Sequence, residues 1–317
     1  MRHIILFSMI VIIVFSTIVF ADSGEVISDS SGYQINNEIK CNDVGCYGGG
    51  CYVYYNKIGK ILCKKLAKDL AKAVAEECRN VLPKIKDALC EKNSDVGTIS
   101  SSGDIYRKFI HITLQKQDVL KAARNHDVYA YTGPCCKKVF DDIHAAAELI
   151  MSTATNSPDK SKIQRIIPHE MTHVFQSSYA PLGTGTDYGL FAEGIADYGG
   201  FASVGKQNEL YCQAGHNDDG KIYVISRSRR YLSSLPVDEQ CLGAFLKWMQ
   251  EKYPKASICE LHKFLKNDYK SLIKPDESYD NPLNIWLAEK IGKSDSLIIS
   301  NLWEEFVNDG TYLKSYS

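Results

Sequence analysis

The sequence lacks a dominant charge of either sign. Its 317 residues include 37 Lys and Arg against 38 Asp and Glu, which leaves a formal net charge of -1. No overall field attracts nucleic acid or an anionic membrane surface, so neither is expected as a partner. The chain also contains no Asn-x-Ser/Thr sequon, no internal repeat and no low-complexity tract. N-glycosylation is therefore not expected.

The longest apolar run stands at the very start of the chain. A short polar start precedes Ile4–Phe15, and Val19 and Ala21 then allow cleavage before Asp22. This pattern predicts a secretory signal peptide over residues 1–21. An uncleaved signal anchor is the alternative, because the run is only just long enough to span a bilayer. No stop-transfer cluster of Lys or Arg follows, so we expect cleavage, secretion and no stable membrane anchor.

Eleven cysteines are many for a cytosolic protein and ordinary for an exported one. Six of them crowd the first third of the chain: Cys41, Cys46, Cys51, Cys63, Cys78 and Cys90. Their spacings match no zinc-knuckle or Cys-x-x-Cys pattern, so we expect disulfides, whose connectivity stays open. The odd total leaves at least one thiol free or paired with another chain. The adjacent Cys135 and Cys136 are expected to bond to two different partners.

The mature chain divides into two expected parts, residues 22–100 and residues 101–317. The first part is Cys-rich and partly helical. It begins with a loose, polar stretch and continues with a disulfide-pinned loop, CNDVGCYGGGCYVYY. A helical pattern over Lys60–Lys92 follows, and Pro83 is expected to interrupt it before a second short helix.

The second part begins with strand patterns and continues with helical ones. The runs RKFIHITLQ, DVYAYTG and KKVFDDIHAAAELI are typical of strands in a small sheet. After Asp159 the segments CLGAFLKWMQEKY, SICELHKFLKNDY, NIWLAEKIG and LIISNLWEEFVNDG are amphipathic and helical. Strands followed by helices predict an α+β fold, with a small mixed sheet and a mostly helical C-terminal part.

The stretch HEMTH carries the strongest chemical signal. Positions i and i+4 lie on one face of a helix, so His169 and His173 can present two imidazoles to one metal ion. Glu170 lies at the edge of that face, where it can take a proton from a metal-bound water. Pro168 suits a first helical turn, so the helix either begins there or kinks just before the ligands. A surface helix with two histidines is the competing interpretation.

The classes of zinc peptidase differ in their third ligand. Metzincins need a glycine and a histidine where this chain has Gln176 and Tyr179, so that class is excluded. Aspzincins use an aspartate in a Gly-Thr-x-x-Asp-x-x-Tyr-Gly motif. The segment GTGTDYG resembles this motif but lacks two residues between Asp187 and Tyr188, so Asp187 is the alternative third ligand. The Gly-x-Met-x-Asn element of common zinc aminopeptidases is absent, so an endopeptidase is the default expectation.

Glu193 fits the third position best. It lies twenty residues after His173, and Asp197 follows one helical turn later, as in gluzincins of the thermolysin kind. One turn then separates a zinc-binding carboxylate from an acid that fixes the tautomer of the first ligand, His169. An ordinary solvated helix face is the alternative, but the apolar flanks in LFAEGIADYGG predict burial, where two free carboxylates would be costly. The sequence therefore predicts a zinc site.

Two segments, HEMTHVFQ and GLFAEGIADY, together resemble the plant basic secretory protein family, secreted zinc peptidases of plants, bacteria and fungi. The similarity runs over about residues 104–306, with weaker matches at VYAYTG, DDIHAAAELI and LWEEF. The resemblance implies a zincin-like fold, zinc bound by His169, His173 and Glu193, and Glu170 as the general base.

Three features depart from that family. Its helix continues with other residues where this chain has Gly199 and Gly200, and two glycines predict that the helix ends early and reshapes one wall of the cleft. The resemblance does not cover the Cys-rich region Cys41–Cys90. The chain is also not basic, which indicates partners different from those of the family's namesakes.

A zinc peptidase also needs a donor for the tetrahedral oxyanion. His216 is the first candidate, followed by Tyr198 and Tyr179. For each of them, a surface or packing role is the competing interpretation. His262 is expected at the surface.

The sequence thus predicts a secreted zinc metallopeptidase that acts on proteins or peptides. A secreted zinc-containing binding or defence protein with little turnover is the first alternative. The presence of Glu170 argues against it, because inactive relatives tend to lose the base first. The second alternative makes the Cys-rich segment an independent binding module or an inhibitory pro-segment, whose free cysteine caps the zinc.

Overall fold

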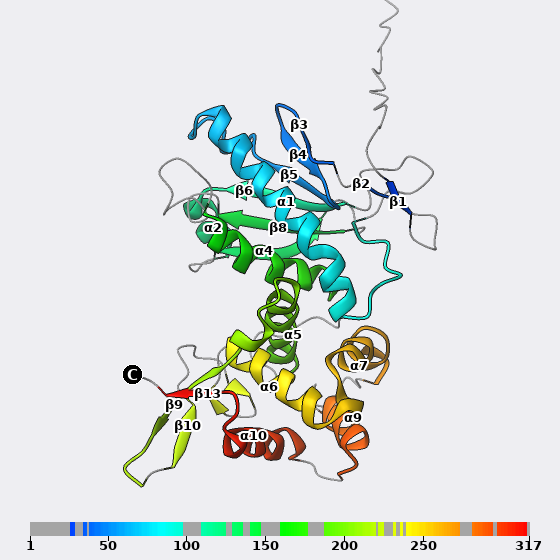
Figure 1. Cartoon of the computed structure of the whole chain (residues 1–317), viewed down its shortest axis with the longest axis vertical. Coiled ribbons are helices and arrows are strands. Elements are labelled where there is room, and N and C mark those ends of the chain that lie inside the picture. Colours follow the sequence, from blue (N-terminus) through cyan, green and yellow to red (C-terminus); the bar gives the residue numbers. More distant parts are fainter. Residues whose placement is uncertain are drawn as a thin grey trace, which may run out of the picture.

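The structure is a computed structural model, and the part of the chain that it describes begins at Val26. The described residues are 26–28, 34–36, 38–97, 109–124, 129–135, 140–146, 159–176, 187–219, 221–224, 231–232, 235–236, 239–272, 281–293 and 297–315. The expected signal peptide and Tyr179 lie outside them. Strands and helices are mixed in the first half and helices prevail in the second, so the α+β class with a mostly helical C-terminal part is confirmed (Figure 1).

A mixed sheet of six strands forms the upper layer in Figure 1. In spatial order the strands are β3 (Lys40–Cys41), β4 (Gly45–Gly48), β5 (Cys51–Tyr54), β6 (Ile110–Gln115), β8 (Phe140–Ala146) and β7 (Ala130–Cys135). The central strands β5, β6 and β8 run parallel, whereas β3, β4 and β7 pair antiparallel. Every residue of β6 is buried, so this strand is covered on both faces.

The stretch CNDVGCYGGGCYVYY does not form the expected loop. It forms β3, β4 and β5, because Gly48, Gly49 and Gly50 have positive φ and make the tight turn between the last two strands. The expected disulfide pin is present, since Cys41 bonds to Cys46 across the β3–β4 turn.

One continuous helix, α1 (Lys64–Ala88), replaces the two expected helices, and Pro83 lies inside it. A proline in a helix interior costs about 3 kcal/mol. The buried face of α1 outweighs that cost, because Leu70, Val74, Val81 and Ile85 are all at most 1% exposed and burial of each contributes about 1.5–3 kcal/mol.

The Cys-rich segment belongs to the same core as the rest of the fold. Its strand β5 pairs in parallel with β6, and α1 packs against β4, β5, α4 (Lys160–Phe175) and α5 (Asp187–Ser203). A single hydrophobic cluster contains residues of all these elements. The expected division at residue 100 therefore runs through a continuous sheet and a continuous core.

Below the sheet in Figure 1, α4 is followed by α5 and then by α6 (Glu239–Lys252). Helix α5 packs against both α4 and α6. Asp159 caps α4 by accepting hydrogen bonds from the backbone N–H groups of Ser161 and Lys162. Of the two alternatives expected at Pro168, a helix start is excluded, because Pro168 lies in the second half of α4. A kink before the ligands stays a prediction.

Among the remaining helices, α7, α9 and α10 lie in the segments that the sequence predicts to be helical, whereas α2, η3 and η4 were not expected. Their bounds are α2 Gln117–Arg124, η3 Gln207–Glu209, η4 Pro254–Ala256, α7 Ile258–Lys263, η5 Phe264–Asp268, α8 Tyr269–Leu272, α9 Asn281–Ile291 and α10 Ile298–Asp309. None of the helices in the described ranges is both long and apolar enough to cross a membrane.

Several short strands were not expected from the sequence. A second sheet combines β9 (Cys212–His216) with β10 (Ile222–Val224) and β13 (Leu313–Ser315). Two small hairpins complete the described strands: β1 (Val26–Ser28) with β2 (Gln34–Asn36), and β11 (Tyr231–Leu232) with β12 (Leu235–Pro236).

Two further disulfides join distant parts of the chain, Cys90–Cys259 and Cys212–Cys241. Cys51, Cys63 and Cys78 are free thiols, so the expectation of disulfides fails at these three positions. Cys51 and Cys78 are fully buried in the hydrophobic core, where they act as small apolar side chains. The prediction for Cys135 and Cys136 lies outside the described side chains.

The Cys90–Cys259 bond is accompanied by a buried polar contact. Glu91 accepts hydrogen bonds from His262 Nε2 and from the ammonium group of Lys266. The prediction that His262 lies at the surface is wrong, because its side chain is completely buried against this carboxylate.

Candidate metal centre

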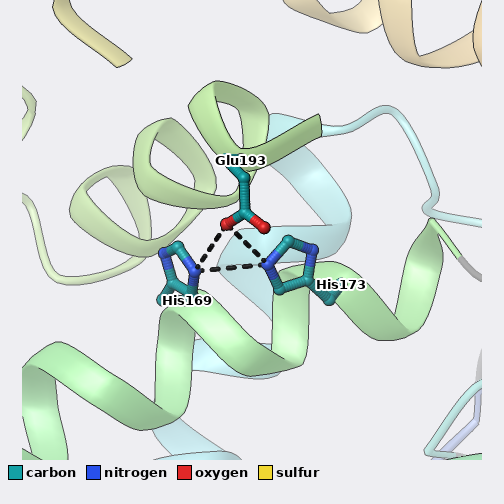
Figure 2. A group of neighbouring side chains, drawn as sticks. All are labelled: His169, His173 and Glu193. Atoms are coloured by element: carbon teal, nitrogen blue, oxygen red, sulfur yellow. Dashed lines mark hydrogen bonds and ion pairs between the residues drawn. The ribbon is translucent and has the colours of Figure 1, made fainter. Parts of the chain in front are cut away.

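His169, His173 and Glu193 converge between α4 and α5, as Figure 2 shows. The two histidines extend from consecutive turns of α4, and the glutamate reaches them from α5. The Nε2 atoms of the histidines are 3.2 Å apart. Glu193 Oε2 lies 3.4 Å from Nε2 of His169 and 3.3 Å from Nε2 of His173. Among the described residues, this is the group of side chains that could hold a metal ion.

The triangle of these three atoms has the size that a tetrahedral zinc site requires. With zinc–ligand distances of about 2.0–2.1 Å and angles of about 109°, neighbouring ligand atoms lie about 3.3–3.4 Å apart. The observed edges of 3.2, 3.3 and 3.4 Å agree with that value. The donor set of two imidazoles and a carboxylate also suits zinc and leaves a fourth position for water or substrate.

Each imidazole is held by a hydrogen bond at its other nitrogen. His169 Nδ1 donates to Asp197 Oδ1 at 2.8 Å, and His173 Nδ1 donates to Gln176 Oε1 at 2.6 Å. With the proton on Nδ1, the lone pair of each ring lies on Nε2, which faces the centre of the triangle. Both rings are therefore already oriented for metal binding. The predicted position of Asp197 behind the first ligand agrees with this geometry.

The electrostatics of the site favour a positive charge between the ligands. Burial lowers the pKa of His169, but the hydrogen bonds and charges of Asp197 and Glu193 outweigh burial and raise that pKa well above its usual range. The pKa of His173 is raised for the same reason, chiefly by Glu193. Burial alone would raise the pKa of Glu193, yet His173 and His169 lower it well below its usual range. The carboxylates of Glu193 and Asp197 thus place negative charge around the two imidazoles.

Glu170, the predicted base, is buried, and a residue of the sheet holds its carboxylate by a hydrogen bond. The hydroxyl oxygen Oγ1 of Thr132, in β7, lies 2.8 Å from Glu170 Oε2 and 2.9 Å from the Glu170 carbonyl oxygen. Only 8% of Glu170 is exposed. The edge strand of the sheet thus holds the carboxylate beside the two ligand histidines.

Gly199 and Gly200 bring α5 close to α4 at the site itself. A Cβ atom on Gly199 would lie 2.7 Å from Thr172 Oγ1, and one on Gly200 would lie 3.2 Å from the backbone nitrogen of His169. The prediction that these glycines end the helix early is wrong, because α5 continues to Ser203. The tight packing of α5 on α4 offsets the lower helix propensity of glycine.

The candidate oxyanion donors do not join the cluster. His216 is exposed at the end of β9, and Figure 1 shows the β9–β10 pair extending away from α4. The hydroxyl of Tyr198 accepts a hydrogen bond from Gln250 of α6, at 3.1 Å. Tyr179 and the side chain of the alternative ligand Asp187 lie outside the part that the structure describes.

Two residues of the site were missed by sequence reasoning. Gln176 entered only as the residue that excludes metzincins, and Thr132 was one position in a strand pattern. The position of Gln176, three residues after the second ligand, is a local signal because i and i+3 share a helix face. No sequence signal points to Thr132, since the register of β7 against α4 is a tertiary contact.

The fold and the site define an α+β protein with a candidate metal centre of two histidines and a glutamate, beside a buried carboxylate. The sequence profile of the BSP family, described as a peptidase of plants and bacteria, matches residues 68–306. The chain belongs to this family, and all the residues of the candidate centre lie within the match. The match begins inside α1, so the family similarity starts earlier than the expected residue 104. No curated protein matches the chain.

Proposed function

We propose that this chain is a zinc-dependent metallopeptidase with a zincin-like fold, in which His169, His173 and Glu193 bind zinc and Glu170 is the general base. The observation that carries this proposal is the triangle of ligand atoms, with edges of 3.2 to 3.4 Å and both imidazoles held at Nδ1. Membership of a peptidase family makes proteins or peptides the substrates.

Zinc, when bound, would lower the pKa of a water molecule and polarise the scissile carbonyl. The protein's own part is the movement of the proton. Glu170 takes the proton of the attacking water on a carboxylate oxygen and then delivers it to the nitrogen of the leaving amine. The proposal assigns this role to Glu170 because it follows His169 directly in α4 and its charge acts on both histidines.

Thr132 supports both states of Glu170. While Glu170 is ionised, the threonine hydroxyl donates to Oε2. Once Glu170 carries the proton, the same hydroxyl can turn to the Glu170 carbonyl oxygen, which lies 2.9 Å away. The base then keeps its position through the reaction without a fixed positive charge beside it.

The strand β7 is proposed as the guide for the substrate backbone. It is the last strand in the order of the six-stranded sheet, and it lies in contact with α4. An extended peptide that adds a strand to a sheet gains main-chain hydrogen bonds. Pairing along β7 would carry a peptide past Thr132 and so toward Glu170, which favours cleavage within a chain over removal of a terminal residue.

Export of the protein is part of the proposal. The predicted signal peptide over residues 1–21 and the disulfides Cys41–Cys46, Cys90–Cys259 and Cys212–Cys241 both fit an oxidising compartment.

The structure gives little support to the two alternative functions. A binding protein without turnover has no use for a base as closely held as Glu170. A removable pro-segment is disfavoured because β3 to β5 and α1 form part of the central sheet and core. None of the free cysteines Cys51, Cys63 and Cys78 belongs to the metal-binding group.

The proposal is tested by incubating the zinc-loaded protein with a mixed peptide library and identifying the cleavage products by mass spectrometry. Glu170→Gln is the control, because it keeps the shape of the base and removes its proton affinity. Cleavage by the wild type alone is expected. Confirmed zinc binding with no cleavage by either protein would contradict peptidase activity and favour the binding protein.

A further inference from the structure

Gln176 ends α4 and is 4% exposed, and both ends of its side-chain amide are engaged. Its Oε1 accepts a hydrogen bond from His173 Nδ1 at 2.6 Å, and its Nε2 donates to the carbonyl oxygen of Ala192 at 2.9 Å. Ala192 is the residue directly before Glu193 in α5. A single buried amide therefore connects the second ligand of the candidate centre to the backbone that carries the third.

We propose that Gln176 is a positioning residue for the metal centre. It sets the tautomer of His173 and fixes the distance between this imidazole and Glu193, and thereby sets the affinity for zinc. The inference deepens the proposed function and rests on it, since it assigns a role in the same site.

The direction of these hydrogen bonds follows from donor and acceptor chemistry. The Ala192 carbonyl can only accept, so the amide nitrogen of Gln176 must face it. The amide oxygen then faces His173 and can only accept, so His173 must carry its proton on Nδ1. The lone pair of the ring is left on Nε2, the atom that lies 3.2 Å from His169 Nε2. The carbonyl of α5 thus decides, through Gln176, which imidazole nitrogen can bind a metal.

The neutral amide also suits the charge of the centre. Glu193, the Asp197 carboxylate behind His169 and Glu170 already contribute three negative charges, more than the two positive charges of one divalent cation. An acid at position 176 would add a fourth negative charge and would face the Ala192 carbonyl with an acceptor instead of a donor. Glutamine makes both hydrogen bonds and adds no charge.

Gln176→Met tests this role, because methionine has a similar length and makes neither hydrogen bond. Gln250→Met is the matched control. The amide of Gln250 is also engaged at both ends, donating to the Tyr198 hydroxyl and accepting from the backbone N–H of Ile258 at 3.3 Å. Gln250 lies on α6, outside the group of candidate ligands.

The dissociation constant for zinc is measured by competition with a chelator of known affinity, and Co²⁺ absorption reports the ligand geometry. We expect Gln176→Met to weaken zinc binding by about 10- to 100-fold, the usual effect of losing a residue that orients a ligand. The Co²⁺ spectrum should change as well. Gln250→Met should leave both unchanged, even where it lowers the melting temperature of the metal-free protein.

Gln176→Glu distinguishes the effects of the two hydrogen bonds. It is also the test variant to use if Gln176→Met does not fold. It keeps an acceptor for His173 Nδ1, loses the donor to Ala192 and adds a negative charge, so it should bind zinc more tightly than Gln176→Met. Wild-type affinity in Gln176→Met, or equal losses in the Glu and Met variants, would overturn the inference. If the wild type itself binds no zinc, the proposed function fails instead.

Discussion

The side chains of the candidate centre occur as hydrogen-bonded pairs. Asp197 holds His169, Gln176 holds His173, and Thr132 holds Glu170. A side chain that acts on a substrate must keep one rotamer, and in a partly open site a buried neighbour supplies that restriction. The residue that holds the other in each pair, namely Asp197, Gln176 or Thr132, therefore determines how well its partner can work.

Thr132→Val should lower kcat about tenfold or more without releasing zinc. Valine keeps the shape of threonine and removes the hydroxyl, and a hydrogen bond to a charged group contributes about 1.5–3 kcal/mol. The measurement is kcat together with zinc content, on a peptide found in the library experiment. Thr132→Ser keeps the hydroxyl and should retain most of the activity. An unchanged kcat in the valine variant would show that β7 does not orient the base.

At the level of elements, the site depends on how closely α5 approaches α4. Thr172 is completely buried and its hydroxyl donates to the Pro168 carbonyl at 2.9 Å, so it cannot easily move away from Gly199. Helix α5 also carries Glu193 and Asp197, which contact the two histidines of α4. Any separation of the two helices at Gly199 would therefore move the third ligand away from the histidines.

Gly199→Ala should weaken zinc binding about tenfold, although alanine favours the helix by about 1 kcal/mol. Its Cβ would lie 2.7 Å from Thr172 Oγ1, which forces the helices apart. The double variant Gly199→Ala with Thr172→Ala should recover part of the affinity, since the clashing atoms are removed. Gly59→Ala is the matched control, because a Cβ there meets no atom closer than 3.7 Å. Additive effects of the two substitutions would contradict this account.

At the scale of the whole molecule, the N-terminal segment is connected to the rest of the fold in two places, by strand pairing and by a disulfide. The strands β3 to β5 complete the sheet, and the Cys90–Cys259 disulfide connects the end of α1 to α7. The segment is a structural part of the fold that carries the candidate metal centre.

A chain that begins after Lys92 should not fold. This chain lacks β3 to β5 and α1. Their loss would expose β6 and the faces of α4 and α5 that α1 covers. Thermal unfolding followed by circular dichroism should show no cooperative transition for this chain. A chain that begins at Glu38 retains all six strands of the sheet and should unfold cooperatively. A folded, more active chain without residues 1–92 would support the pro-segment alternative.

The Glu91 contact should make the stability of the protein fall in acid. Burial raises the pKa of Glu91, but its hydrogen bonds to His262 and Lys266 outweigh burial and lower the pKa from 4.5 to about 2. The ionised carboxylate therefore stabilises the fold above about pH 4.5, and this contribution is lost as the pH falls toward about 2. At about 1.4 kcal/mol for each pKa unit, it amounts to about 3 kcal/mol at most.

Urea unfolding without reductant, over about pH 7 to 2, measures this contribution. Glu91→Gln should be less stable at neutral pH and should lose less stability in acid than the wild type. Glu260→Gln is the control, because its carboxylate pairs with Lys263 at the surface, where ion pairs contribute little. Equal acid sensitivity of the wild type and Glu91→Gln would show that the Glu91 contact does not cause the loss of stability in acid.

The local patterns of the sequence predicted much of the fold. The strands β6, β7 and β8 and the helices α6, α7, α9 and α10 lie where periodicity placed them, because side-chain alternation and helical spacing are local properties. The expectations at Pro83 and Gly199 failed for one physical reason: burial against distant elements outweighed the local preferences of proline and glycine. The loop expected in the cysteine-rich stretch failed because the pairing of β5 with the distant β6 is a tertiary contact.

The same division applies to the candidate site. The sequence by itself determined the ligand types and their spacing, since His169, His173 and Glu170 share one helix and Glu193 and Asp197 lie one turn apart on the next. Only the tertiary structure brought the two helices to contact, supplied Thr132 as the partner of Glu170, and placed the Ala192 carbonyl against Gln176. Which atoms of separate elements face each other depends on packing between those elements, and packing is set by the whole core and by no local pattern.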